Sequence, residues 1–148
     1  MTNFLAIDYG KRHVGLGWGS SDIGVAFPCK PILCGPGKDF WTALGNVVHG
    51  KKVEAFVLGW PISMDGGITP WTEEVGTFAG RLRKKFSLPI YLSDERLTSY
   101  QVKRDLEEMG LRAPYESHIR RRRSGVEDSC AAALFLQDFF NGGARSIF

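Results

Sequence analysis

Three short, almost wholly apolar runs are the feature that most constrains the fold of this chain. They cover residues 4–7, 53–58 and 88–92, and a helical pattern separates the last two. A strand can be apolar on both sides only when both faces of its sheet are covered, which is typical of helices packed on parallel strands. The pattern therefore predicts an α/β protein.

Two further extended segments follow the first run and predict an antiparallel meander. Residues 13–18 alternate loosely between apolar and polar side chains, as a second strand would. Residues 25–33 include Pro28 and Pro31, which suit an edge strand because proline cannot donate a ladder hydrogen bond. The glycine-containing turn at residues 9–11 is short enough to connect antiparallel neighbours.

Helical patterns fill most of the remaining sequence. Thr69 can cap a helix that begins with Pro70, and Thr98 with Gln101 forms a second start signal. The predicted helices cover residues 39–48, 69–86, 98–110 and 125–140. Together the patterns predict one domain over residues 1–148, with a mixed five-stranded sheet of three antiparallel N-terminal strands followed by parallel strands, flanked by helices.

Cysteine content and hydropathy bear on the compartment. Cys29, Cys34 and Cys130 are an odd number without paired metal-type spacing, which argues against a disulfide framework and a zinc site. Residues 1–10 lack the basic leader of a signal peptide, and no apolar stretch reaches the roughly 20 residues that span a bilayer. We therefore expect a cytoplasmic protein without a membrane partner.

Three carboxylates lie at positions that structure alone explains poorly. Asp8 ends the first apolar run, where it either bonds the turn backbone around Gly10 or has a functional role. Asp128 shares a helix face with apolar residues, and its helix start is already satisfied by Ser124 and Glu127. The dipole gain of a first-turn acid, roughly 0.3 to 1 kcal/mol, is too small to explain burial, so we favour function for Asp128.

Glu95 follows the third apolar run, and its position alone favours a loop acid paired with Arg96. Strand carboxyl ends are also where open α/β sheets place ligands. If Asp8, Glu95 and Asp128 converge, they form an oxygen cage suited to Mg²⁺ or Mn²⁺. Two such ions are a known arrangement for in-line phosphoryl displacement.

The net charge of +3 is too small to indicate a nucleic-acid partner, but the basic residues are clustered. A run of four arginines lies in the predicted mobile loop, residues 110–125, where it either contacts phosphates or is only solvated. Its nearness to Asp128 favours binding. The candidate nucleic-acid-binding residues are Lys11, Arg12, Arg96, Arg120, Arg121, Arg122 and Arg123.

Four motifs resemble the YqgF (RuvX) family of bacterial proteins, described as pre-16S rRNA nucleases and earlier as Holliday junction resolvase homologues. They lie at residues 6–10 (AIDYG), 59–66 (GWPISMDG), 94–98 (DERLT) and 128–138, and so span nearly the whole chain. The loop at residues 59–66 either seats a phosphate or only packs. One departure from the family pattern is His13, where the family usually has arginine.

The resemblance implies a ribonuclease H-like fold in which Asp8, Glu95 and Asp128 are the catalytic acids and the metal ligands. By the same resemblance, Asp8 contacts both metal ions and the other two acids hold one each. The implied activity is cleavage of structured RNA, with maturation of the 5′ end of pre-16S rRNA in ribosome biogenesis as its leading form.

Alternative functions remain open at this point. A Holliday junction resolvase acting on DNA would use the same acids, and a noncatalytic nucleic-acid or ribosome-binding factor could keep the fold. The chain is too short for the two-domain sugar-kinase or actin-like ATPases. The oligomeric state, monomer or homodimer, is also open, because Trp18, Trp71 and Phe148 either form an interface or pack internally.

Overall fold

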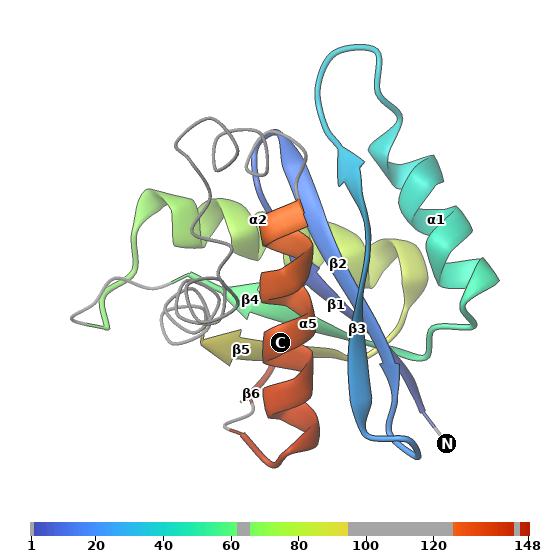
Figure 1. The fold of residues 1–148 in the computed structure, drawn as a ribbon. Helices are drawn as coiled ribbons and strands as arrows, with labels where there is room; N and C mark the ends of the chain where they lie inside the picture. Colours follow the sequence, from blue (N-terminus) through green and yellow to red (C-terminus); the bar gives the residue numbers. More distant parts are fainter. Residues whose placement is uncertain (1, 62–65, 95–125, 144–145) are drawn as a thin grey trace, which may run out of the picture.

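A computed structural model describes residues 2–61, 66–94, 126–143 and 146–148. Helices α1 and α2 cover one face of a mixed sheet and α5 covers the other (Figure 1). The elements are β1 Asn3–Asp8, β2 His13–Ser20, β3 Val25–Leu33, α1 Phe40–Gly50, β4 Ala55–Trp60, α2 Pro70–Phe86, β5 Ile90–Asp94, α5 Val126–Phe140 and β6 Ser146–Ile147. In the described residues, no helix combines the length and apolar character that crossing a membrane requires.

The strand order is β3-β2-β1-β4-β5-β6. β1 to β3 form the predicted antiparallel meander, while β4 pairs parallel with β1 and β5 pairs parallel with β4. Ile7 lies beside Leu58, which lies beside Leu92, so β1, β4 and β5 end at the same edge of the sheet. We call this edge, where Asp8, Trp60 and Asp94 end their strands, the carboxyl edge.

The prediction of five strands was one short. β6 pairs antiparallel with β5, placing Ile147 beside Tyr91. Two exposed residues are too few to make a periodic pattern, which is why the sequence contained no signal for this strand. The backbone of Phe148 holds this strand in place. Its N–H donates to the Ile90 carbonyl, and its carbonyl accepts from the Arg83 guanidinium.

The described helices begin where the sequence predicted. Asp39 caps α1 by accepting from the Thr42 N–H, and Thr69 caps α2 by accepting from the Thr72 N–H. The Thr72 hydroxyl oxygen in turn accepts from the Thr69 N–H, which completes a capping box. The sequence prediction of this helix start did not include the role of Thr72. On α2 the predicted solvent face is exposed, at Arg81, Lys84 and Lys85. The predicted helix at 98–110 lies outside the described residues.

Strand alternation divides the core into two layers. Leu5 and Ile7 pack under α1 and α2, and the alternate residues Phe4 and Ala6 pack under α5. Trp18, Trp71 and Phe148 are half-buried against the first layer. Each of the three therefore packs on the core while part of its side chain stays exposed.

Alternate glycines on β2 allow α5 to lie directly on the sheet. A Cβ atom on Gly15 would overlap the Asp128 backbone, one on Gly17 would lie 2.7 Å from the Ala133 nitrogen, and one on Gly19 would lie 2.7 Å from the Phe140 ring. A real Cβ has no such space, and because α5 backbone atoms block it at Gly15 and Gly17, a side chain at either position would push α5 outward. Glycine thus sets the distance between the helix and the strand.

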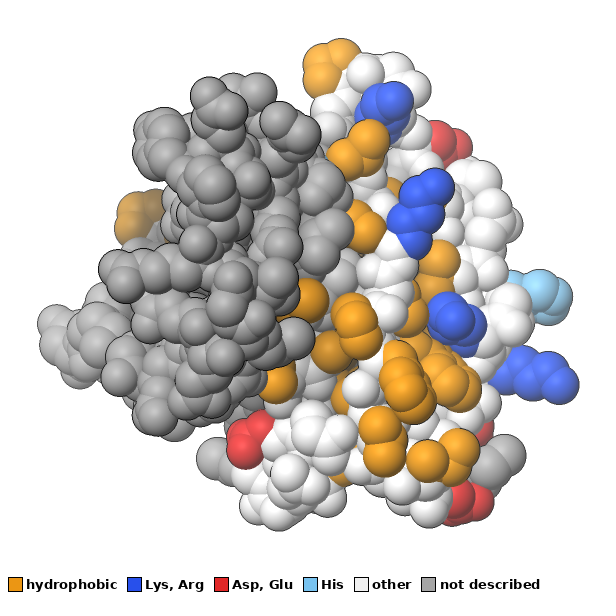
Figure 2. Space-filling model, in the orientation of Figure 1, with side chains coloured by type: hydrophobic (Ala, Val, Ile, Leu, Met, Phe, Trp, Pro, Cys, Tyr) orange, Lys and Arg blue, Asp and Glu red, His pale blue; other side chains and the backbone are white. Residues whose placement is uncertain are grey.

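β3 is an edge strand, as its two prolines predicted. Val25, Phe27 and Leu33 on this strand are exposed large hydrophobic residues. Figure 2 shows hydrophobic side chains at the surface beside α5, over the region where β3 lies. The Gln137 side chain of α5 ties the start of β3 down, accepting from the Ala26 N–H at 3.0 Å and donating to the Gly24 carbonyl at 2.8 Å.

We predict that Gly17→Ala destabilises the fold by about 1–3 kcal/mol, the usual range for overpacking a tight core. The new methyl group would meet the backbone of Ala133, which cannot rotate away as a side chain can. Gly80→Ala on α2 is the control: a Cβ there meets no atom within 4 Å, and we expect a gain of about 0.5–1 kcal/mol. Urea unfolding measures both, and equal stability of the two variants would contradict the close contact.

Candidate active site

Asp8 is the last residue of β1 and its exposed fraction is only 8%. Because Phe4 and Ala6 face α5, strand alternation places the Asp8 side chain on the α5 face as well. Removing a carboxylate from water is costly unless other groups or a cation stabilise it. Asp8 is therefore a buried acid at the end of a strand, where stabilising partners are required.

Asp128 lies in the first turn of α5 and is half-buried. Its backbone rests on Gly15, and Gly15 is the β2 residue that pairs with Asp8. The neighbouring Ser129 fixes this contact, because its buried Oγ accepts from the Leu16 N–H at 3.1 Å. Two acids that are 120 positions apart in the sequence therefore adjoin the same glycine.

Small residues surround Asp8 along the sheet. On β2, Gly15 pairs with Asp8. On the other side of β1, Leu58 of β4 pairs with Ile7, and the next residue of β4 is Gly59. Gly59 in turn pairs with the buried Ser93. Local patterns do not predict a role for Gly15 or Ser93, although the alternate glycines of residues 15–19 are a visible signal of close packing. Small residues thus lie next to Asp8 on the sheet, and at Gly15 the α5 backbone occupies the place of a side chain.

The third acid and most candidate phosphate contacts lie outside the described residues. Glu95 follows directly after β5, which ends at the carboxyl edge. The residues Arg96, Arg120, Arg121, Arg122 and Arg123 are also outside. Within the described ranges, no group of three His, Cys, Asp or Glu side chains is gathered closely enough to hold a metal ion. The described part therefore contributes two of the three predicted acids.

The two described acids suit a divalent cation. Asp8 is buried and Asp128 is half-buried, and a bound cation would offset the cost of removing such carboxylates from water. Their ligand atoms are hard oxygens, which favour Mg²⁺ or Mn²⁺ over softer metals. The location at strand ends also matches the general position of ligand sites in open α/β sheets.

Lys11 and Arg12 are exposed in the turn between β1 and β2. The Arg12 carbonyl accepts from the Cys34 N–H at 2.8 Å, which ties this turn to the end of β3. The Lys11 ammonium lies 5.6 Å from the centre of the Trp71 ring. Both cations are thus held near the carboxyl edge with their side chains at the surface.

Tyr9 follows Asp8 and belongs to a stack of four rings, which we call the aromatic ladder. Tyr9 stacks on Phe78 at 4.1 Å and on Trp71 at 5.7 Å, and Phe78 stacks on Trp41 at 5.6 Å. Burial, followed by the nearby Cys34 and Glu74, raises the pKa of Tyr9 above its ordinary 10.0, and Arg81 partly opposes this. Tyr9 therefore stays protonated near neutral pH and does not serve as a base.

The loop at residues 59–66 is held at its first described end. The Thr72 hydroxyl donates to the Pro61 carbonyl, and Trp60 packs against the core beneath α2. Gly66 has a φ of +88°, which side chains other than glycine rarely adopt. The packing interpretation thus fits Trp60 and Pro61, while residues 62–65 lie outside the described part.

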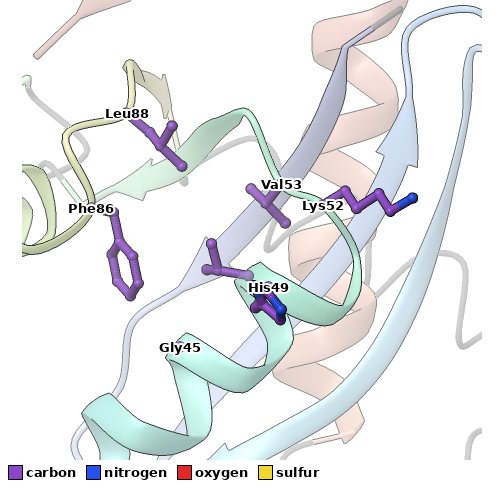
Figure 3. Close-up of a pocket in the computed structure, with 7 residues that line it drawn as sticks. Gly45, His49, Lys52, Val53, Phe86 and Leu88 are labelled. Carbon is purple, nitrogen blue, oxygen red and sulfur yellow. The ribbon is translucent and has the colours of Figure 1, made fainter.

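A pocket of about 560 Å³ lies at the opposite edge of the sheet. It opens between the C-terminal ends of α1 and α2, and His49, Val53, Phe86 and Leu88 line it (Figure 3). Val53 and Leu88 precede β4 and β5, so the pocket is separated from Asp8 by the length of the strands. It is not part of the candidate site.

The chain is similar to a known protein family over nearly its whole length. Residues 2–142 match the model of the RuvX family, described as Holliday junction resolvase. The chain belongs to the RuvX family. It is similar to proteins named "Putative pre-16S rRNA nuclease" in Rickettsia typhi, with 34% identity over 95% of this chain and 86% of the relative, and in Opitutus terrae, with 36% identity over 93% and 90%.

Solved structures agree on the architecture of this RuvX family member. The chain is similar to Thermus thermophilus RuvC bound to a Holliday junction substrate, with a TM-score of 0.55, 18% identity and full coverage of both chains. Another Thermus thermophilus RuvC structure matches with a TM-score of 0.50 and 19% identity over 99% of this chain and all of that one. The predicted ribonuclease H-like fold is confirmed.

We predict that Tyr9 makes stability depend on alkaline pH. Its pKa is higher in the folded chain, so from about pH 10 upward the unfolded chain loses the proton first and stability falls as the pH rises. In Tyr9→Phe this part of the loss is absent. Urea unfolding between about pH 9 and pH 11 measures it, and an equal loss in both proteins would contradict the burial of the hydroxyl.

Proposed function

We propose that this chain is a divalent-metal-dependent nuclease that hydrolyses phosphodiester bonds. The observation that carries the proposal is the packing of α5 on β2, where the Asp128 backbone lies against Gly15, the strand partner of the buried Asp8. Glu95, which follows β5 at the same edge, is proposed as the third acid. The names of the relatives and of the family support the same activity.

The proposed role of the acids is to bind and orient the metal. Two Mg²⁺ or Mn²⁺ ions would activate a water molecule and neutralise charge on the departing oxygen. Asp8 lies on a strand and Asp128 on a helix, so both carboxylates are held by rigid backbone. Rigid placement matters because catalytic groups displaced by even an ångström lose much of their effect.

The proposed substrate is structured RNA, with maturation of the 5′ end of pre-16S rRNA as its physiological form. The names of relatives at 34–36% identity favour this substrate. A Holliday junction is the second candidate, because the family description and a structurally similar complex both concern that substrate. Either substrate presents a distorted phosphate backbone to the same edge.

We predict that Asp8→Asn and Asp128→Asn each lower Mg²⁺-dependent cleavage by more than about a hundredfold, because loss of an outer-shell partner alone costs about 10- to 100-fold. The amide keeps the shape of the side chain but weakens the ligand. Asp138→Asn is the matched control, since Asp138 is an exposed acid on the same helix. Initial rates on a labelled RNA hairpin provide the measurement.

The same variants separate the enzyme from a noncatalytic binding factor. If purified Asp8→Asn cleaves as fast as the unmodified chain, the activity belongs to a contaminant and the binding factor is the better explanation. A structure with Mn²⁺ adds a direct test of the site. Manganese bound away from Asp8 and Asp128 would rule out the proposed centre.

We predict faster cleavage of a precursor 16S rRNA fragment that spans the mature 5′ end than of a four-way DNA junction. Both substrates are compared side by side at equal concentration, with Asp8→Asn as the blank. A mature 16S fragment is the matched control because it lacks the precursor segment. Preferential, symmetric cutting of the junction would replace the rRNA proposal with the resolvase.

A further inference from the structure

The aromatic ladder ends at the carboxyl edge in a cation–aromatic pair. Trp71 is the second residue of α2, is half-buried, and stacks on Tyr9 with an angle of 16° between the rings. The exposed Lys11 lies over the same indole. A half-buried indole covered by a flexible lysine is a surface on which a planar group can bind once the lysine moves aside.

The ladder makes Trp71 a rigid platform. Tyr9 is fixed in turn by Phe78, whose exposed fraction is 4%, at a ring separation of 4.1 Å. Tyr9 is also the residue next to Asp8, so the ladder and the candidate active site share one strand end. Asp8 faces α5 and Tyr9 faces α2, which places the two groups on opposite sides of the same edge.

We propose that the Lys11–Trp71 pair binds an unpaired base of the substrate strand next to the cleaved phosphate, with the base on the indole and the ammonium on a phosphate. The pair would hold a strand that crosses the carboxyl edge from the α5 face to the α2 face. This inference rests on the proposed nuclease function and adds the requirement for a single-stranded segment.

Typical magnitudes favour the exchange. Stacking of a nucleobase on an aromatic side chain contributes more to binding than a cation–aromatic contact at an exposed site, and the displaced lysine gains a phosphate contact. A base is therefore expected to displace Lys11 from the ring.

Binding of fluorescein-labelled ten-nucleotide oligo(U) and oligo(dT) tests the platform by fluorescence anisotropy. All variants carry Asp8→Asn and are measured in EDTA, so the result does not depend on cleavage or metal. We expect Trp71→Leu to weaken binding about 5- to 100-fold and Trp71→Phe, which keeps a ring, to weaken it only a few-fold. Lys11→Ala is expected to weaken binding and to lower the salt dependence by about one phosphate contact.

The chain supplies a matched control in a second pair of the same kind. Lys51 lies 5.3 Å from the centre of the half-buried Trp18 ring, and Trp18 pairs with Leu5, three residues before Asp8 on β1. Trp18→Leu and Lys51→Ala should leave oligonucleotide binding unchanged. Urea unfolding of each variant checks that the fold is retained.

The outcomes separate this inference from the nuclease itself. Loss of binding in Trp71→Leu with both oligonucleotides supports stacking of any base, and loss with oligo(U) alone supports a platform for RNA. If the parent does not bind at low salt, or if Trp71→Leu binds as tightly as Trp71→Phe, the platform is wrong. Neither result affects the cleavage tests on Asp8 and Asp128, which can fail independently.

Discussion

The close contact between α5 and the glycines of β2 is the constraint on which the rest of the structure depends. A helix normally stands off a sheet by the length of the side chains between them. Here Gly15 and Gly17 remove those side chains, and the backbone of α5 rests on the strand, while Gly19 accommodates the Phe140 ring. The Ser129 hydroxyl and the Gln137 amide then fix the helix by hydrogen bonds to strand or hairpin backbone. The glycine contacts and these hydrogen bonds together set the distance of α5 from β2 and its register along the strand.

This contact makes the candidate site a consequence of packing. Asp128 is brought to Asp8 because its own backbone is the part of α5 that touches Gly15. A side chain at position 15 would separate the two acids even if both were unchanged. The parallel arrangement of β1, β4 and β5 adds the position after Asp94 to the same edge. Asp8 and Asp128 therefore come from two elements whose relative position is fixed by the sheet and by the glycines of β2.

The sequence predicted the elements well and their mutual contacts poorly. β3 was predicted with its observed bounds, and the capping Thr69 and the buried Asp8 also followed from local patterns. Such features depend on periodicity and on the chemistry of neighbouring residues. The nearness of Asp8 to Asp128 had to come from family resemblance, because it depends on the height of a helix above the sheet. Likewise β6 and the aromatic ladder arise from contacts between distant segments, which local patterns do not encode.

The alternation of a single strand divides the carboxyl edge into two chemically different sides. On β1, Asp8 faces α5 with its small neighbours Gly15 and Gly59, and the next residue, Tyr9, joins the ring stack on the α2 side. One side thus offers carboxylate oxygens, and the other offers the flat surface of an aromatic ring with a cation over it. Adjacent residues on a strand are only about 3.8 Å apart, so a chain molecule crossing the edge would meet both sides within one or two of its units. In a nucleic acid these units contain both phosphates, which suit a metal held by the acids, and bases, which suit the aromatic side.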